Sequence, residues 1–403
     1  MALIDTPEVQ RLRRIRQLGF TYLVYPGAEH SRFAHSMGVT WLCLSMLERL
    51  SQRIAITQQE RLVTVAAALL HDVGHGPFSH AVEAVTGVHH EVYSRDIILD
   101  PDSGVGRALR SFDETLPAQV AARLDEQEGQ GEHSTRPFLS QLVSSQLDAD
   151  RLDYILRDGH ATGVKIGNYD LTRIMALLDV VDGHLAVHMG AREAVEGYLL
   201  ARFHMYKQVY LHKTSRTAER MLEALLRRAS ELRADGGRLK FVPHGPLGRL
   251  IGGERLDAAA FATLDDMDVW VAIKRWRDEP DTMLAALCDG LVNRRLWKPF
   301  VLPTDDDHRA DELLAAARSV ARVNGYDPAY AALVDNSEDT LYSPYTGVGQ
   351  RRGIRLVDSA GNATFIEDSS EVVGMLSQLQ LRQRLLCVHP ALRPAIHRTL
   401  RGC

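Results

Sequence analysis

The sequence predicts a mainly α-helical protein, in which a large all-α region with one small β-hairpin precedes a small α+β module. Long runs of strong helix formers, such as residues 62–70, and the Asp-Gly turn signal at residues 182–183 between short β-prone runs indicate the first part. Strand-like segments after about residue 330 indicate the second part. We therefore expect one domain over residues 1–325 and a C-terminal module over residues 326–403.

The composition is that of an ordinary globular protein and argues against several classes. The 403 residues are 45% hydrophobic and 25% charged, and no run approaches the ~18 apolar residues of a membrane span. The four cysteines form no C-x-x-C pair, which excludes a cysteine-based zinc finger and fits a reducing compartment. The N-terminus has no signal-peptide features, so we expect a cytoplasmic protein. The formal net charge of -5 gives no global attraction to nucleic acid, which is not indicated as a partner.

The N-terminal region predicts two helices. A basic helix is expected over residues 5–20, ended by Gly19. Its arginines would ordinarily form a solvated face, and the alternative is a surface that meets an anion. An amphipathic helix is expected over residues 39–53. His35 stands at its opening, three residues after Arg32 and so on a similar face.

The stretch over residues 69–80 is the most informative part of the chain. It begins as the end of an apolar helix and is then broken by two glycines and a proline. Within this break His71 and Asp72 are of the residue types that bind divalent metals. The spacing of His71 and His75 is also that of a zinc peptidase, but that motif needs an unbroken helix through both histidines.

Further polar groups and elements follow along the chain. A later acidic helix carries Asp148, Asp150 and Asp153, and spacing alone does not choose which of the three would complete a metal site. Residues 126–135 are expected to form a polar loop. The remaining expected elements are a hairpin with a type I′ turn over residues 180–185, a long helix over 191–232, and strands over 353–357 and 363–366.

With one histidine, a His-Asp pair and an acidic helix in this order, the sequence resembles the HD-domain phosphohydrolases. More narrowly, it looks like the deoxynucleoside triphosphate triphosphohydrolases related to the SAM-and-HD-domain enzyme, without the SAM domain. A bare His-Asp pair is a weak signal, whereas an ordered series of motifs is specific. Six segments within residues 10–215 carry the resemblance: 14–19, 25–28, 32–39, 71–80, 148–158 and 210–213. The C-terminal third matches only loosely.

The resemblance implies a role for each of several residues. The implied ligands of a divalent metal ion are His35, His71, Asp72 and Asp150. The ion would be Mg²⁺, Mn²⁺ or iron, with Zn²⁺ or Ni²⁺ as further options. The implied phosphate-contacting and acid–base groups are His75, His80, Glu83 and His90. The implied substrate-binding residues are Gln17, Leu18, Arg32, Arg151, Tyr154, Asp158, Arg202 and Tyr210. Taken alone, Arg151 and Arg202 are equally compatible with surface salt bridges.

The implied reaction is hydrolysis of a deoxynucleoside triphosphate to a deoxynucleoside and inorganic triphosphate, by attack of water at the α-phosphorus. His80, held by Glu83, is the expected proton donor to the departing 5′-oxygen, and His90 is the other candidate. The resemblance also implies deoxynucleoside triphosphates as partners, an activating nucleotide and a homo-oligomer, either a dimer or a tetramer.

Three alternatives stay open. The same metal site would also serve a nucleotidase, a phosphodiesterase or a 3′–5′ nuclease. A nucleotide-sensing regulator with little turnover would explain the arginine-rich N-terminal segment and the C-terminal module. A zinc peptidase, with Asp72 as its base rather than as a ligand, is a more distant alternative.

Overall fold

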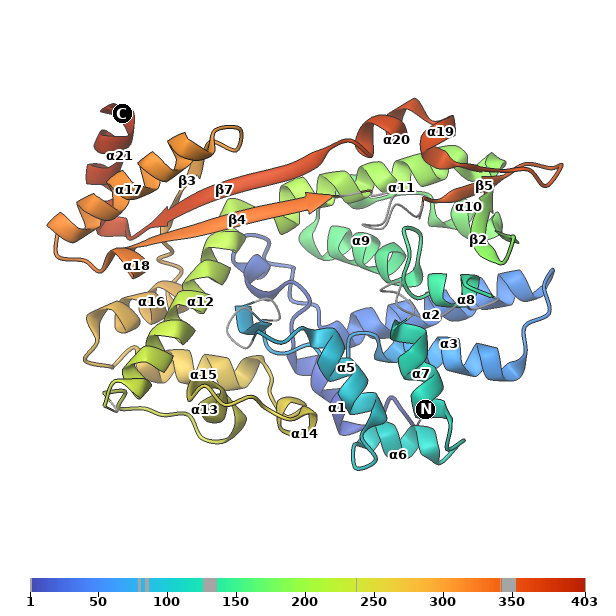
Figure 1. Ribbon diagram of the computed structural model, residues 1–403, viewed down its shortest axis with the longest axis horizontal. Coiled ribbons are helices and arrows are strands. Elements are labelled where there is room, and N and C mark those ends of the chain that lie inside the picture. The colour runs from blue at the N-terminus through green and yellow to red at the C-terminus, as the bar shows by residue number, and fades with distance from the viewer. Residues whose placement is uncertain are drawn as a thin grey trace.

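The computed structural model describes residues 2–78, 81–83, 87–125, 136–236, 238–340, 342 and 353–402. It is mainly α-helical with two small sheets, which confirms the predicted fold class (Figure 1). The helices that precede the first strand are α1 (Pro7–Arg11), α2 (Arg32–Ser51), α3 (Gln58–Leu70), α5 (His90–Leu99), α6 (Gly104–Arg110), α7 (Leu116–Asp125), α8 (Phe138–Gln141), α9 (Ala149–Thr162) and α10 (Leu171–Ala176). In the part of the chain that the structure describes, no helix combines the length and apolar character needed to cross a membrane.

The N-terminal segment differs from the predicted helix over residues 5–20. Helix α1 is followed by a 3₁₀ turn over Leu12–Arg14, and the chain then becomes extended at Ile15. The prediction of one continuous helix is wrong because the backbone here pairs with the segment before α2. The amide of Arg32 donates to the carbonyl of Ile15 at 2.9 Å, and that of Gln17 donates to His30 at 3.0 Å. The pairing brings Gln17 beside the start of α2.

Helices α2 and α3 position the histidines of the predicted metal site: α2 carries His35, and α3 ends directly before His71. Helix α2 begins at Arg32, earlier than predicted, with Ser31 as its N-cap. Helix α3 has a capping box, in which the side chain of Thr57 accepts a hydrogen bond from the Glu60 amide and the Glu60 carboxylate accepts one from the Thr57 amide. Helix α3 ends at Leu70, directly before His71, and it packs against α2. The break after α3 agrees with the predicted end of the apolar helix.

The predicted long helix over residues 191–232 is interrupted. The structure has α11 (Arg192–Met205), a π-helical turn over Tyr206–Tyr210, and α12 (Lys213–Ala234). Helix α12 begins anew because Nδ1 of His212 accepts a hydrogen bond from the Thr214 amide at 3.2 Å. The helical pattern continues across this break in the sequence, so periodicity alone did not reveal it. Short π-helical turns of this kind are frequent at functional sites.

The hairpin is confirmed and belongs to a four-stranded sheet. Its strands are β1 (Leu178–Val181) and β2 (His184–His188), and positive φ angles at Asp182 and Gly183 agree with a type I′ turn. Strand β2 pairs in parallel with β5 (Arg355–Val357), which pairs with β6 (Ala363–Phe365). The two predicted C-terminal strands therefore return to the hairpin.

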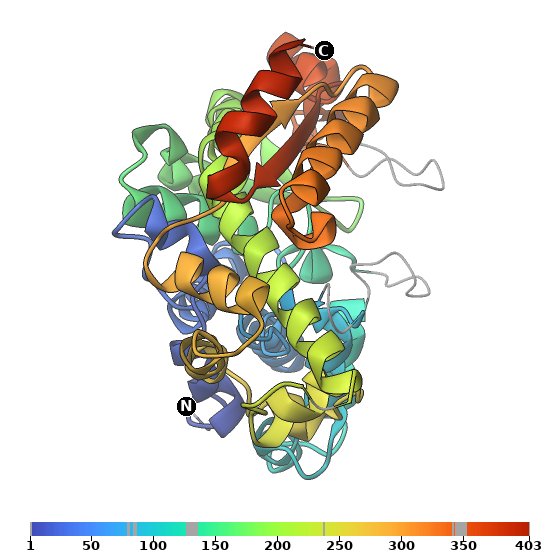
Figure 2. The same cartoon turned by 90° about the vertical axis from the view of Figure 1, so that its left-hand side faces the viewer.

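A second sheet has the strand order β3-β7-β4. Its strands are β3 (Lys298–Leu302), β4 (Ala332–Thr340) and β7 (Gln380–Val388), which pair in antiparallel fashion. The helices of the second half of the chain are α13 (Gly245–Ile251), α14 (Ala258–Phe261), α15 (Asp266–Trp276), α16 (Thr282–Val292), α17 (Asp307–Val323), α18 (Pro328–Ala331), α19 (Ile366–Ser369), α20 (Glu371–Leu376) and α21 (Arg393–Gly402). Helices α17 and α21 pack side by side over this sheet (Figure 2). Strand β3 precedes the predicted boundary at residue 325 and pairs with β7 beyond it; the boundary stays a prediction.

Helix α12 meets the β3-β7-β4 sheet through a partly buried charge network. Arg216 contacts both carboxylate oxygens of Asp335 on β4, and Arg220 contacts the same carboxylate at 3.2 Å. Arg220 also lies 2.6 Å from Glu223. Burial nevertheless raises the pKa of Glu223 to about 7 from its ordinary value of 4.5.

This raised pKa makes the stability of the protein depend on pH. Because the folded state holds the Glu223 proton more tightly than the unfolded chain does, its stabilising contribution is complete below about pH 4.5 and is lost as the pH rises through about 7. Glu223→Gln removes the titrating group, so we expect the unfolding free energy of the variant to depend less on pH. When the pH is raised from roughly 5 to 8, the unfolding free energy of wild type should fall by up to about 3 kcal/mol more than that of the variant. Urea unfolding at both pH values measures the difference, and parallel pH profiles of the two proteins would contradict it.

Candidate active site

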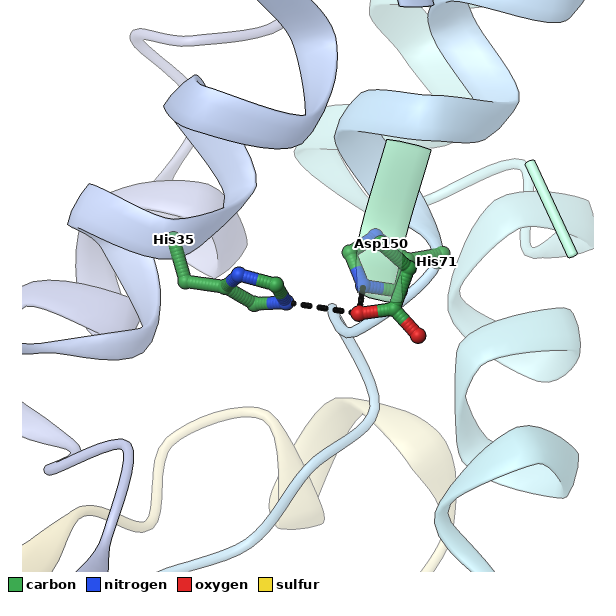
Figure 3. A group of neighbouring side chains, drawn as sticks. All are labelled: His35, His71 and Asp150. Carbon is green, nitrogen blue, oxygen red and sulfur yellow. Dashed lines mark ion pairs between the residues drawn. The ribbon is translucent and has the colours of Figure 1, made fainter. Parts of the chain in front are cut away.

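Three elements bring together the four residues that the resemblance implies as metal ligands. His35 lies on α2, His71 and Asp72 directly follow α3, and Asp150 lies in the first turn of α9. Nε2 of His35 is 3.0 Å and Nε2 of His71 is 3.7 Å from Oδ1 of Asp150. The Asp72 carboxylate also lies in this cluster, with its Oδ1 atom 3.3 Å from His71 Nε2. Figure 3 shows both imidazole rings directed at the Asp150 carboxylate.

The three aspartates of the acidic helix have different partners, which the sequence left open. Asp148 is the N-cap of α9 and accepts a hydrogen bond from the amide of Arg151 at 2.6 Å. Asp150 faces the two histidines. Asp153, one turn later, contacts Nδ1 of His35 at 2.8 Å. Asp150 is therefore the carboxylate of this helix that lies between the two histidines.

The electrostatics of this cluster favour positive charge. Burial opposes a charge on His35, but Asp150 and Asp153 outweigh it and raise the pKa of His35 to about 10. The pKa of His71 is raised in the same way, mainly by Asp72 against burial. The pKa of the Asp150 carboxyl is held below its ordinary value by the two histidines although burial opposes this. The negative charge of such a buried carboxylate cluster is neutralised either by protons on the histidines or by a bound cation.

The donor atoms also fit a divalent metal ion. Nδ1 of His71 donates to the carbonyl of Ala68 at 2.9 Å, which leaves Nε2 with a free lone pair. That Nε2 atom is buried and makes no hydrogen bond to any residue that the structure describes. Imidazole nitrogen together with carboxylate oxygen suits ions such as Mn²⁺, iron or Zn²⁺. The group formed by His35, His71 and Asp150 is compact enough to share one ion.

A second set of polar residues adjoins Asp72. Nε2 of His75 lies 3.2 Å from Asp72 Oδ1, and the His75 ring stacks on that of His90 at 3.6 Å between centroids. Burial and the nearby Arg32 guanidinium lower the pKa of His75 well below its ordinary value. Nδ1 of His90 lies 2.7 Å from Oε1 of Glu83. The structure thus places Glu83 against His90; His80 lies outside the described residues, so its expected pairing with Glu83 stays a prediction.

The three arginines predicted at the substrate have different surroundings. Nη1 of Arg32 donates to Asp72 Oδ2 at 2.6 Å, so this guanidinium lies at the metal cluster. Arg151 is bound by the side chain of Asp148 and the carbonyl of Ser145. Arg202 is buried, and it donates to the side chain of Gln146 at 3.2 Å. Contact between Arg151 or Arg202 and a substrate stays a prediction.

An aromatic ring, that of Tyr154, and a carboxylate, that of Asp158, lie on the same face of α9 as Asp150. Tyr154 and Asp158 follow Asp150 at intervals of four residues, which places all three along one side of the helix. The hydroxyl of Tyr210, on the π-helical turn, donates to Asp158 Oδ2 at 2.8 Å, and its ring lies 6.1 Å from that of Tyr154. Nε2 of His30 lies 2.7 Å from the other Asp158 oxygen. His30 was not predicted, and its place in the segment that carries Arg32 and His35 was the one available signal.

Gln17 and Leu18 lie next to this group through the backbone pairing of the N-terminal segment. The Gln17 amide donates to the His30 carbonyl, and Oε1 of its side chain is buried with no hydrogen-bond donor among the described residues. Leu18 packs against the main hydrophobic core. The structure therefore places Gln17 against the backbone of His30, whose ring contacts Asp158.

Comparisons with known proteins agree with this arrangement. A model of the HD domain matches residues 32–135, and a model of an HD associated region matches residues 169–239. The uncharacterized protein YwfO of Bacillus subtilis is 36% identical over 93% of this chain and 84% of its own length. The chain belongs to the HD-domain phosphohydrolase superfamily. The crystal structure of a phosphohydrolase from Bacteroides thetaiotaomicron is similar to this HD-domain protein with a TM-score of 0.82 and 33% identity, over 96% of this chain and 94% of that one.

Relatives with a named activity are more distant from this HD-domain phosphohydrolase. The deoxynucleoside triphosphate triphosphohydrolase SAMHD1 of Gallus gallus is 32% identical over 56% of this chain and 42% of that protein. The human SAMHD1 is 30% identical over 55% of this chain and 40% of that protein. The chain thus spans less than half the length of either SAMHD1. HD domains bind divalent metals, and the His/Asp cluster of this HD domain has the residue types for such an ion.

Proposed function

We propose that this HD-domain phosphohydrolase hydrolyses deoxynucleoside triphosphates to deoxynucleoside and inorganic triphosphate. The observation that carries the proposal is the face of α9. Asp150 joins the His/Asp cluster, whereas Tyr154 and Asp158 form an aromatic and hydrogen-bonding surface one and two turns further along. A ligand with a polyphosphate at one end and a sugar and base at the other matches this order of groups. The similarity to SAMHD1 supports the same substrate class.

The residues of the chain would divide the reaction between them. A divalent cation held by His35, His71, Asp72 and Asp150 would supply charge neutralisation on phosphoryl oxygen and a more acidic water. Arg32 would bind phosphate oxygens, since a guanidinium offers paired donors to them.

Water would add to the α-phosphorus as the bond to the 5′-oxygen breaks, and that oxygen needs a proton. His90, held through Nδ1 by Glu83, would offer the proton from Nε2. His80, the donor expected from the sequence, lies outside the described residues and becomes the second candidate. Asp158 and Tyr210 would orient the sugar.

Identification of the products tests the proposal. The purified protein is incubated with each deoxynucleoside triphosphate, singly and mixed, with Mg²⁺ or Mn²⁺, and inorganic triphosphate and nucleoside are measured. Equal amounts of the two products support the proposal, and activity seen only in mixtures would support an activating nucleotide as well. Release of orthophosphate or a monophosphate would instead favour a nucleotidase, phosphodiesterase or nuclease on the same site. The proposal extends to a homo-oligomer, which sedimentation with and without nucleotide would reveal.

The Tyr210 hydroxyl gives a prediction for the substrate side of the site. Tyr210→Phe removes the hydrogen bond to Asp158 and leaves the ring in place. We expect kcat/KM for deoxynucleoside triphosphates to fall by about 5- to 30-fold, because the hydrogen bond that holds Asp158 in place is worth roughly 1–2 kcal/mol. Steady-state kinetics measure the loss.

A matched control for this variant is Tyr169→Phe. The Tyr169 hydroxyl also donates a partly buried hydrogen bond, at 2.6 Å to the carbonyl of Leu152 within α9, but that bond does not involve Asp158. This variant is expected to lose stability and to keep kcat/KM. Equal kinetic losses in the two variants would contradict a direct role for Tyr210.

A further inference from the structure

A buried ion pair holds the imidazole edge of His35 that faces away from Asp150. Nδ1 of His35 is 2.8 Å from Oδ2 of Asp153. Arg157 contacts both oxygens of that carboxylate, with Nε 2.7 Å from Oδ2 and Nη2 2.8 Å from Oδ1. Asp153 is buried, whereas the Arg157 side chain is 30% exposed. An Arg–Asp–His chain therefore runs from the surface to the metal cluster.

The two histidines of the cluster are held differently. Nδ1 of His71 donates to a neutral carbonyl, that of Ala68, whereas Nδ1 of His35 faces a carboxylate. A carboxylate partner fixes the tautomer of an imidazole and makes its other nitrogen a stronger metal ligand. A carboxylate that is itself fixed by two guanidinium hydrogen bonds also restricts the rotation of the ring.

The sequence of α2 accommodates this ion pair with a glycine. Gly38 lies one turn after His35, and a Cβ atom at this position would overlap Oδ1 of Asp153 and Nη2 of Arg157. Glycine inside a helix costs about 0.5–1 kcal/mol relative to alanine. The glycine stands at the turn of α2 where the ion pair of α9 approaches the backbone, so a larger residue would displace that pair.

We propose that Asp153, clamped by Arg157, is a positioning residue for metal binding. When a divalent cation between His35, His71 and Asp150 takes the place of the Nε2 proton, Asp153 holds the remaining proton of His35 on Nδ1. This inference rests on the metal dependence of the proposed function and not on the identity of the substrate.

Asp153→Asn separates positioning from packing, because it keeps the shape of the side chain. His35 Nδ1 and Arg157 Nε share Oδ2, and Arg157 Nη2 faces Oδ1, so either orientation of the amide sets its NH₂ group against a guanidinium donor and breaks the clamp. The neutral amide neither restricts the His35 ring as the clamped carboxylate does nor makes its Nε2 as strong a metal ligand. We expect Mn²⁺ to bind the nucleotide-free variant about 10- to 100-fold more weakly than wild type. Electron paramagnetic resonance of free Mn²⁺ measures the affinity.

A matched control is Asp179→Asn. It makes the same chemical change and breaks an ion pair of 2.9 Å with Arg53, which lies just past the end of α2. We expect its Mn²⁺ affinity to equal that of wild type. In ¹⁵N-histidine spectra of the Zn²⁺-loaded proteins, wild type and Asp179→Asn should show a His35 ring with a protonated Nδ1. Asp153→Asn should shift the His35 signals and leave those of His71 as in wild type, which a general structural defect would not do.

The possible results are decisive in each case. A folded Asp153→Asn protein with wild-type Mn²⁺ affinity would overturn the inference. If that variant does not fold, Arg157→Gln decides, because it leaves Asp153 in place without its clamp. Weakening by about threefold or more at an unchanged melting temperature supports the inference, and wild-type affinity overturns it. Wild-type protein that binds Mn²⁺ without hydrolysing nucleotides would refute only the proposed function.

Discussion

Asp72→Asn is expected to abolish hydrolysis. Asp72 is the centre of the site, since its two oxygens contact Arg32 at 2.6 Å, His71 at 3.3 Å and His75 at 3.2 Å. Its pKa is held far below the ordinary value by His71, His75 and Arg32 although burial opposes this, so the group is a carboxylate at neutral pH. An amide has nearly the same shape but no negative charge, and it is a weak metal ligand.

The loss should be at least about a thousandfold in kcat/KM, which corresponds to roughly 4 kcal/mol of transition-state stabilisation. Initial rates of triphosphate release measure it, and circular dichroism establishes that the variant is folded. Asp96→Asn, a change at an exposed position of α5, is the control and should keep full activity. Activity that survives Asp72→Asn would place the chemistry elsewhere. If even wild type shows nucleotide binding without turnover, the regulator alternative becomes the better one.

Local patterns in the sequence predicted the fold class, and the family resemblance carried by the ordered motifs named the residues of the His/Asp cluster. The ordered motifs around His35, His71 and Asp150 name side chains that the structure brings within hydrogen-bond distance of one another or nearly so. The Asp-Gly turn was recognisable because its positive φ angles require such residues. These features are properties of short segments.

The features that were missed depend on contacts between distant segments. The helix over residues 5–20 is interrupted because Ile15 and Gln17 pair with the segment before α2. Helix propensity describes only the local chain, so it does not predict this pairing with a distant segment. The spacing of the three aspartates could not assign Asp153 to the rear of His35, because that assignment needs the packing of α9 against α2. His30 was missed for the same reason, since its partner Asp158 is more than a hundred residues away.

Gly74→Ala is expected to be among the most destabilising single substitutions in the protein. Gly74 lies two residues after Asp72, where helix α5 crosses the His-Asp stretch. A Cβ atom at Gly74 would overlap the backbone amide of Ser94 and the carbonyl of His90, and neither backbone group can rotate away. The Gly74 amide also donates to the Ser94 hydroxyl at 2.9 Å, and that hydroxyl donates to the His71 carbonyl at 3.1 Å. The substitution must therefore push α5 away from the site.

We expect Gly74→Ala to cost about 3–5 kcal/mol in the free energy of unfolding, because overlap with backbone cannot be relieved by rotamer changes. We also expect lower activity in the folded fraction, because α5 carries His90 and its displacement would separate that ring from His75. Gly197→Ala, within α11, is the matched control with the opposite sign. A Cβ there meets open space, so the change should stabilise the protein by about 0.5–1 kcal/mol. Urea unfolding of the three proteins measures both effects, and a Gly74→Ala variant as stable as wild type would show that α5 does not close on the site as the structure describes.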